Sequence, residues 1–269
     1  MASFSVVSNI ASANAQANLT GTTLGLNRAL NRLSSGFRIN TAGDDAAGLA
    51  VANTYRKDVA IVNQGIRNAN DGLSALQIKD GAANNISTLI DRLATLATQS
   101  ASGSTTASSR VTLDQEFQDV LAEIQRESNV ASLTTNTGFS VFISAETTTA
   151  NGVVAGTISA VTTTTLKLNG HVITSQALAQ SAVAAIASAV TVLGSAQGTL
   201  GTLQNRLQFA ISLAQTQVVN NRAAESRIRD ANVAEESANL TRYNILSQSG
   251  IAALVQANQQ SSAVLSLLR

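Results

Sequence analysis

The sequence predicts a mainly α-helical protein, a long antiparallel helical rod or coiled-coil bundle with a small β-hairpin tip in the middle of the chain. Three observations predict this fold. Apolar residues recur at spacings of three and four in both outer parts of the chain, which places them on one helix face. The 269 residues contain no proline, and a proline in a helix interior costs about 3 kcal/mol. A short central stretch is instead rich in Thr and Val.

The first 130 residues are expected to form helices. We expect Asp71-Gly72 to open one helix and the small polar residues 100–109 to close it. Three apolar stripes support these helices: Leu26, Leu30 and Leu33; Leu73, Leu76, Ala83, Ile86, Ile90, Leu93 and Ala97; and Leu113, Phe117, Val120 and Ile124.

Residues 131–172 are expected to form strands and turns. Asn-Gly pairs stand at 151–152 and 169–170, each between residues that favour strands. An Asn-Gly pair in that setting is a strong short-range hairpin signal. We therefore expect a small β element here.

The stretch from about 175 to 233 is expected to form one returning helix of roughly 60 residues, about 90 Å long at 1.5 Å per residue. Its apolar stripe keeps coiled-coil spacing: Leu200, Leu203, Leu207, Ile211, Ala214 and Val218. A chain that runs out, turns and returns brings both termini to one end. The terminal segments are rich in Ala, Asn and Gln, so we expect them to need each other and neighbouring copies to become ordered. The expected divisions are 1–40 and 233–269 (terminal helices), 41–140 and 175–232 (rod helices) and 141–174 (surface tip).

No residue pattern indicates catalysis, so the chain is expected not to be an enzyme and to use no metal or cofactor. His171 is the only histidine and lies beside a turn, and the absence of cysteine excludes thiolate sites. A net charge of +1 gives no electrostatic case for binding nucleic acid or an anionic membrane. The N-terminus lacks the features of a secretory signal, and the apolar run at 182–194 is too short to span a bilayer.

The segment "RLSSGFRINTAGDDAAGLA" raises the question of an ion site, because Asp44 and Asp45 are adjacent. It lacks the alternating oxygen ligands and distal Glu of a calcium loop. We expect both carboxylates in the first turn of a helix that starts near Asp44, where the helix dipole favours them. Charges on this segment can pair with those on the returning helix, or each can be solvated.

Long stretches at both ends resemble bacterial flagellins. "RLSSGFRINTAGDDAAGLAVA" is similar to the N-terminal signature of that family, and "NANDGLSALQIKDGA" is similar to a later family stretch. "AAESRIRDANVAEESANLTRYNILSQSGIAALVQANQQSSAVLSLL" is similar to the C-terminal signature. Local departures are Asn232 in place of a common Asp, "TNTGFS" before the tip, and the final Arg269.

The resemblance implies a structural subunit that is exported without a cleaved signal and self-assembles into the extracellular flagellar filament for swimming. Implied partners are further copies of the chain, an export chaperone, the cap protein and the hook-associated junction proteins. Terminal helices would line a central channel, and residues near 140–175 would face the medium. The subunit interface candidates are Arg32, Leu33, Arg38, Asn40, Asp44, Asp45, Arg227, Asp230, Leu246 and Leu268.

Flagellins of many bacteria are sensed by a Toll-like receptor, so the resemblance also implies a recognition surface. Arg92, Leu96 and Glu116 match that surface in residue type. The departures from it are Asp91, Ala94 and Thr95. We expect weaker recognition than for a full match.

Two other functions are compatible with parts of this pattern. A hook–filament junction protein would have similar ends, but the C-terminal match to flagellins is more complete than we expect for such a protein. A surface coiled-coil adhesin, from a different class, would lack the paired end signatures. A filament-displayed His-Glu-x-x-His protease is excluded by the single histidine.

Overall fold

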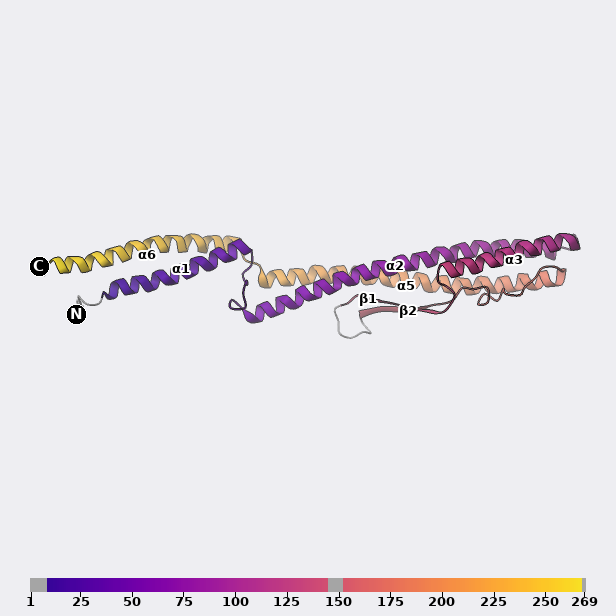
Figure 1. The fold of residues 1–269 in the computed structure, drawn as a ribbon, viewed down its shortest axis with the longest axis horizontal. Coiled ribbons are helices and arrows are strands. Elements are labelled where there is room, and N and C mark those ends of the chain that lie inside the picture. The colour runs from indigo at the N-terminus through magenta and orange to yellow at the C-terminus, as the bar shows by residue number, and fades with distance from the viewer. Residues whose placement is uncertain (1–8, 145–151, 268–269) are drawn as a thin grey trace. The chain divides into compact units, whose positions relative to one another are not determined.

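The computed structural model describes residues 9–144 and 152–267, with side chains up to Gln259. The helices are α1 (Ile10–Ser35), α2 (Ala46–Ala101), α3 (Ala107–Val130), α5 (Gln176–Arg229) and α6 (Val233–Leu267), and the strands are β1 (Thr137–Phe142) and β2 (Val153–Ile158) (Figure 1). The predicted class, mainly helical with one small hairpin, is confirmed.

The chain divides into two compact units, which we describe separately. The terminal unit comprises Met1–Lys57 and Asn220–Arg269, and the central unit comprises Asp58–Val219. The central unit holds the hydrophobic core. There the predicted stripes of α2, α3 and α5 meet, and Leu76, Leu93, Phe117 and Leu200 are all completely buried.

Glycine 72 does not open a helix as predicted, because α2 runs through it without interruption. The glycine serves close packing instead. A Cβ at Gly72 would lie 2.7 Å from Cγ2 of Val141 on β1, and a Cβ at Gly65 would lie 2.1 Å from the carbonyl oxygen of Ile143. Two glycines seven residues apart therefore clear the face of α2 against which the hairpin lies.

The hairpin is antiparallel, with Thr137 opposite Ile158 and Phe142 opposite Val153. The first Asn-Gly prediction falls in its connection, where Asn151 lies outside the described residues. The second hairpin prediction is wrong, because residues 159–175 form turns and no strand. Asn169-Gly170 does make a turn, in which Gly170 has a φ of 82°. The apolar side chains around this turn are buried in the core although their backbone forms no strand: Leu166, Leu168 and Ile173.

The returning helix is shorter than predicted, since α5 ends at Arg229 and α6 begins at Val233. Local capping explains the break. The Asn232 side chain accepts a hydrogen bond from the Ala234 backbone N–H, 3.2 Å away. The Ala231 N–H donates to the Gly36 carbonyl oxygen at 2.9 Å instead of continuing the helix. The expected division between residues 232 and 233 lies beside this break, although no proline or glycine marks it in the sequence.

Candidate assembly surface

Helices α1 and α6 pack antiparallel in the terminal unit (Figure 1). Two contacts fix their register. The Asn9 side chain donates to the Ala257 carbonyl oxygen at 2.9 Å, and the Arg32 guanidinium contacts the Glu236 carboxylate at 3.0 Å. The helices approach closely where α1 has Gly25, because a Cβ there would lie 2.6 Å from the Tyr243 ring. We call these two helices the α1–α6 pair.

The α1–α6 pair has almost no apolar core of its own. In the described part of the terminal unit, the buried apolar residues are Ala29, Ile39 and Ala52. Leu30, from the predicted stripe, is 52% exposed. Further large apolar side chains on the two helices are exposed: Ile10, Leu24, Val233, Ile245, Leu246, Ile251 and Val255. Singly exposed apolar residues are ordinary, but this many along one helix pair indicate an association surface.

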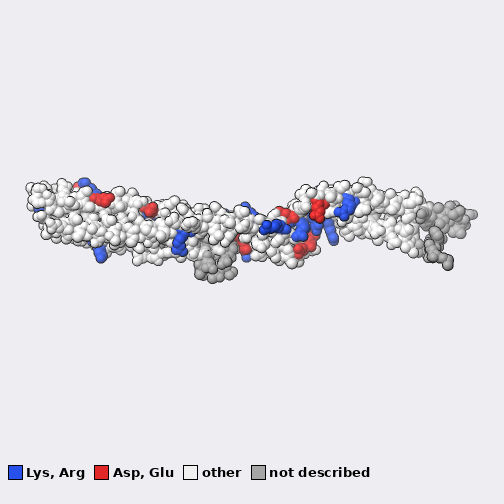
Figure 2. All heavy atoms as spheres, turned by 180° about the vertical axis from the view of Figure 1, so that it is seen from behind, with Lys and Arg blue, Asp and Glu red and all other residues white. Residues whose placement is uncertain are grey.

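The same surface carries no charge along most of its length. Residues 1–27 and 243–268 contain no Asp, Glu, Lys or Arg. On the face drawn in Figure 2, most of the surface is likewise uncharged, and the charged side chains gather in groups. A surface of this kind associates through apolar burial and shape, and charge contributes little.

Helices α1 and α5 both end at a short segment that we call the joint, residues 36–45 with 228–232. Helix α1 ends at Gly36, whose φ of 75° is the left-handed conformation common at helix C-termini. Phe37 and Asp230 then form an antiparallel bridge. The Arg38 N–H donates to the Arg229 carbonyl oxygen at 2.6 Å. Backbone hydrogen bonds therefore hold residues 36–38 against the end of α5.

Arginine side chains reinforce the joint. Arg38 donates from Nη2 to the Ile228 carbonyl oxygen at 2.8 Å, which places a cation at the C-terminus of α5. The Arg229 guanidinium lies 4.2 Å from the centre of the Phe37 ring, a distance at which a cation–π interaction is favourable. Part of the joint thus serves the fold of this chain itself.

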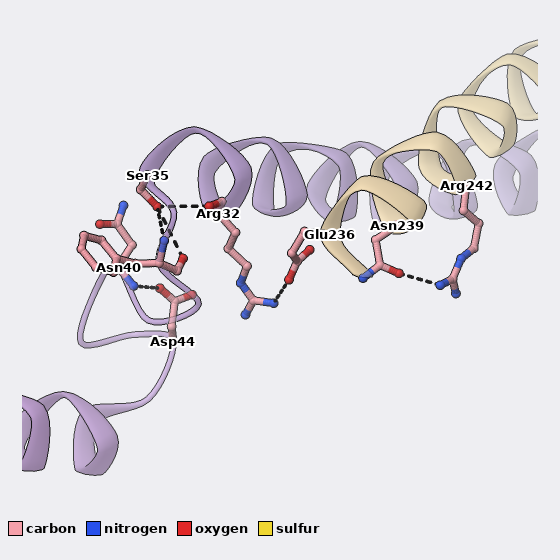
Figure 3. A network of polar contacts seen from close by, with 8 residues as sticks. Arg32, Ser35, Asn40, Asp44, Glu236, Asn239 and Arg242 are labelled. Carbon is pink, nitrogen blue, oxygen red and sulfur yellow. Dashed lines mark hydrogen bonds and ion pairs between the residues drawn. The ribbon is translucent and has the colours of Figure 1, made fainter. Parts of the chain in front are cut away.

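Asp44, whose contact with Asn40 is drawn in Figure 3, and Asp45 both have local structural roles. One Asp44 oxygen accepts hydrogen bonds from the backbone N–H groups of Thr41 (3.0 Å) and Asn40 (3.2 Å). Hydrogen bonds from the backbone and hydroxyl of Thr41, and then from the Asn40 backbone, lower the pKa of the Asp44 carboxyl. Asp45 accepts from the Gly48 N–H at 2.9 Å and caps α2. Both precede the helix, which begins at Ala46, so the prediction that they lie in its first turn is corrected.

The other interface candidates differ in exposure. Asn40, Arg227 and Asp230 are exposed, and Leu33 is half-buried. Leu246 is 45% exposed on α6, and Leu268 lies outside the described residues. Glu236 and Phe37 also belong to this surface, and the sequence pattern gave no signal for either.

The receptor candidates lie in the central unit. Arg92 donates from Nε to the Glu116 carboxylate at 2.8 Å, and their side chains are 53% and 44% exposed. Leu96 is 1% exposed, so its side chain belongs to the core and presents nothing to a partner in this fold. At His171 the backbone carbonyl oxygen accepts a hydrogen bond from the Gln118 side chain, 2.9 Å away. Among the described residues, no group of three His, Cys, Asp or Glu side chains is placed to hold a metal ion.

Paired terminal helices with an uncharged, partly apolar surface and little core define the structural subunit of an assembly. Comparison with known proteins gives its family. Residues 6–141 match the bacterial flagellin N-terminal helical region, and residues 183–268 match the bacterial flagellin C-terminal helical region. The chain belongs to the bacterial flagellin family.

Relatives match along nearly the whole chain. The flagellin of Halalkalibacterium halodurans is 36% identical over 254 residues, with 90% of this chain and 91% of that relative covered. The flagellar filament 33 kDa core protein of Treponema phagedenis is 33% identical, with coverage of 97% and 98%. A crystal structure of Bacillus cereus flagellin is 25% identical with a TM-score of 0.49, covering 59% of this chain and 94% of that one. The family assignment rests on the sequence matches, and the flagellin family is a structural one.

Proposed function

We propose that copies of this chain polymerise into the helical flagellar filament for swimming, and that the α1–α6 pair is the main assembly surface. The observation that carries the proposal is the set of large apolar side chains exposed on this pair, most of whose length carries no charge. Burying one Ile or Leu side chain contributes about 1.5–3 kcal/mol. Neighbouring copies supply the apolar contacts that two helices alone do not make.

The joint contributes orientation more than affinity. Its hydrogen bonds to the end of α5, together with the Arg32–Glu236 ion pair between α1 and α6, hold the helices in one register, so each subunit presents the same surface. The exposed side chains of Asn40 and Arg227 lie beside this surface. Exposed charged and polar groups at the rim of an interface mainly select register and partner. Asp44 and Asp45 act indirectly, by shaping the loop that sets where α2 starts.

Other partners follow from the family alone. We expect export without a cleaved signal and assembly outside the cell, assisted by an export chaperone and a cap protein. Hook-associated junction proteins would contact the first subunits. The function involves no catalysis, nucleic acid or membrane. A junction protein or an adhesin is less well supported. The relative from Treponema phagedenis, which aligns with 97% of this chain, is named a flagellar filament core protein.

Recognition by the flagellin-sensing Toll-like receptor would use Arg92 and Glu116, which are half-exposed and paired. Leu96 is buried in the core, so it would support this surface from beneath without contacting the receptor. Arg92→Ala is expected to reduce signalling in a receptor reporter assay. Full signalling by that variant would remove Arg92 from the recognition surface.

The test of the assembly surface is seeded polymerisation of Leu246→Asp. Acid-dissociated, neutralised monomer is added to short filament seeds, and elongation is measured by negative-stain microscopy. A charge at this 45% exposed position would be buried without a partner in the filament, so elongation should fall by at least about tenfold. Leu246→Met, which keeps the apolar volume, is the control and should elongate normally. Normal elongation by Leu246→Asp would contradict the proposal.

A further inference from the structure

Asn169 and Gly170 form an exposed turn in the central unit, between two buried side chains. Leu168 and Ile173 are both completely buried, whereas Asn169 and Gly170 are exposed. The backbone fixes the start of the turn, because the N–H groups of Leu168 and Asn169 donate to the Thr163 carbonyl oxygen at 2.8 and 3.2 Å. The pair is therefore held in one place and is accessible to water.

The segment that follows the turn is anchored on α3. The Ile173 N–H donates to Oδ1 of Asp114 at 2.7 Å, and Nε2 of Gln118 donates to the His171 carbonyl oxygen at 2.9 Å. Asp114 and Gln118 lie four residues apart on α3, so they share one face of the helix. The backbone from Leu168 to Ile173 thus connects two fixed points.

Two groups of the Asn-Gly pair are free to react with each other. Neither the side-chain amide of Asn169 nor the backbone N–H of Gly170 makes a hydrogen bond with another described residue. Gly170 has a φ of 82°, and a Cβ added there would meet no atom within 4 Å. Glycine also has no side chain that would obstruct its own nitrogen. The Gly170 nitrogen can therefore approach the side-chain carbonyl carbon of Asn169.

Two other exposed asparagines outside the helices lack this freedom. Oδ1 of Asn136 accepts a hydrogen bond from the Ala160 N–H at 2.8 Å. After Asn40, the Thr41 N–H donates to the Asp44 carboxylate at 3.0 Å. In both cases a β-branched threonine follows the asparagine in place of a glycine. These two residues are internal controls for the chemistry of Asn169.

We propose that Asn169 is a self-modification site, which converts to isoaspartate and aspartate without an enzyme. The Gly170 nitrogen bonds to Cγ of Asn169 while the bond from Cγ to the side-chain nitrogen breaks. Ammonia leaves with the proton of the Gly170 N–H, and a succinimide ring remains. Water then adds to a ring carbonyl carbon, whose bond to the Gly170 nitrogen breaks, and that nitrogen receives a proton from the water. Addition at Cγ gives aspartate, and addition at the backbone carbonyl carbon gives isoaspartate.

Isoaspartate would disturb the contact between this segment and α3. The backbone of isoaspartate runs through Cβ and Cγ, so the chain becomes longer between Leu168 and Ile173, which are both fixed in the core. The added length must displace the turn or break the hydrogen bonds at His171 and Ile173. The reaction requires only the folded central unit, and it would mark older molecules of the chain by a less stable core.

The first test maps the modification in wild-type protein stored at mildly alkaline pH. Trypsin cleaves after Lys167 and Arg206, so Asn169 lies in a different peptide from Asn151 of the other Asn-Gly pair. Mass spectrometry should detect the amide-to-acid change at Asn169 at least about tenfold faster than at Asn136 or Asn40. An isoaspartyl methyltransferase, used as a reagent, should methylate the Asn169 peptide. Equal rates at the three asparagines, or no methylation of this peptide, would overturn the proposal.

The second test measures thermal unfolding of fresh and stored protein. Asn169→Gln has a longer side chain that closes a ring much more slowly, and it keeps Asn151, so the two proteins differ only at position 169. Both should have the same Tm when fresh. Storage should lower the Tm of the wild type by about 2–8 °C more than that of Asn169→Gln, because two hydrogen bonds are at risk.

Asn169→Asp separates the two products of the reaction. It introduces the carboxylate without lengthening the backbone, so its Tm should stay close to that of fresh wild type. An equal loss of Tm on storage in wild type and Asn169→Gln would contradict the expected effect on the core. A fresh Asn169→Asp protein with the Tm of stored wild type would assign the effect to charge and overturn the role of the longer backbone.

Discussion

At the scale of single residues, Glu236 shows how two distant segments are joined. Its side chain is 10% exposed, and its partner Arg32 is 33% exposed. The two lie 204 residues apart in sequence. Sequence reasoning selected Arg32 from its motif but not Glu236, because only the register of α1 on α6 brings the two side chains together. The helix dipole favours an acidic residue in the first turn of a helix even without a partner. The position of Glu236 in the sequence therefore did not indicate an ion pair.

Arg32→Met should weaken the pairing of α1 with α6 by about 1–2 kcal/mol, because the Glu236 carboxylate would remain buried without a partner. The Arg32→Met, Glu236→Leu double variant should recover most of that loss, since it removes both charges. Thermal unfolding followed by circular dichroism measures both. Equal destabilisation of the single and double variants would mean that the ion pair does not hold the two helices.

At the scale of elements, the long periodic segments and the loop within 100–109 were predictable, whereas the role of Gly72 and the contacts at the end of α5 were not. The stripes containing Leu93 and Leu200 formed core helices, because repeated apolar spacing over many turns leaves one face to bury. Gly72 was misread because a glycine in a helix can serve either a boundary or a close contact. The break after Arg229 depends on hydrogen bonds between Ala231 and Gly36, which no local pattern contains.

Two glycines of α2 provide a matched test of the packing between α2 and the hairpin. Gly65→Ala should destabilise the central unit by about 1–3 kcal/mol, because the added Cβ overlaps the backbone of Ile143. Gly81→Ala is the control, since a Cβ there meets no atom within 4 Å. It should stabilise α2 by about 0.5–1 kcal/mol. Similar shifts for both variants in thermal unfolding would contradict the close contact seen at Gly65.

At the scale of the whole molecule, the two units differ in how much apolar surface each of them buries. The central unit has a contiguous core from Val59 to Val218, whereas the described part of the terminal unit buries few apolar side chains. A helix pair with so little buried apolar surface is only marginally stable in water. The family could be predicted from the end signatures. The internal contacts of Arg38 and Asp44 could not, because a signature records residue types and not their partners.

The central claim is that neighbouring copies complete the terminal unit. The most direct measurement is amide hydrogen exchange, by mass spectrometry, on the monomer and on the filament. We predict that amides of α1 and α6 exchange readily in the monomer and become at least about 100-fold more protected in the filament. Core amides around Leu93 and Phe117 should be protected in both states. Equal protection of α1 and α6 in monomer and filament would contradict the account, because these helices would then be complete without a second copy.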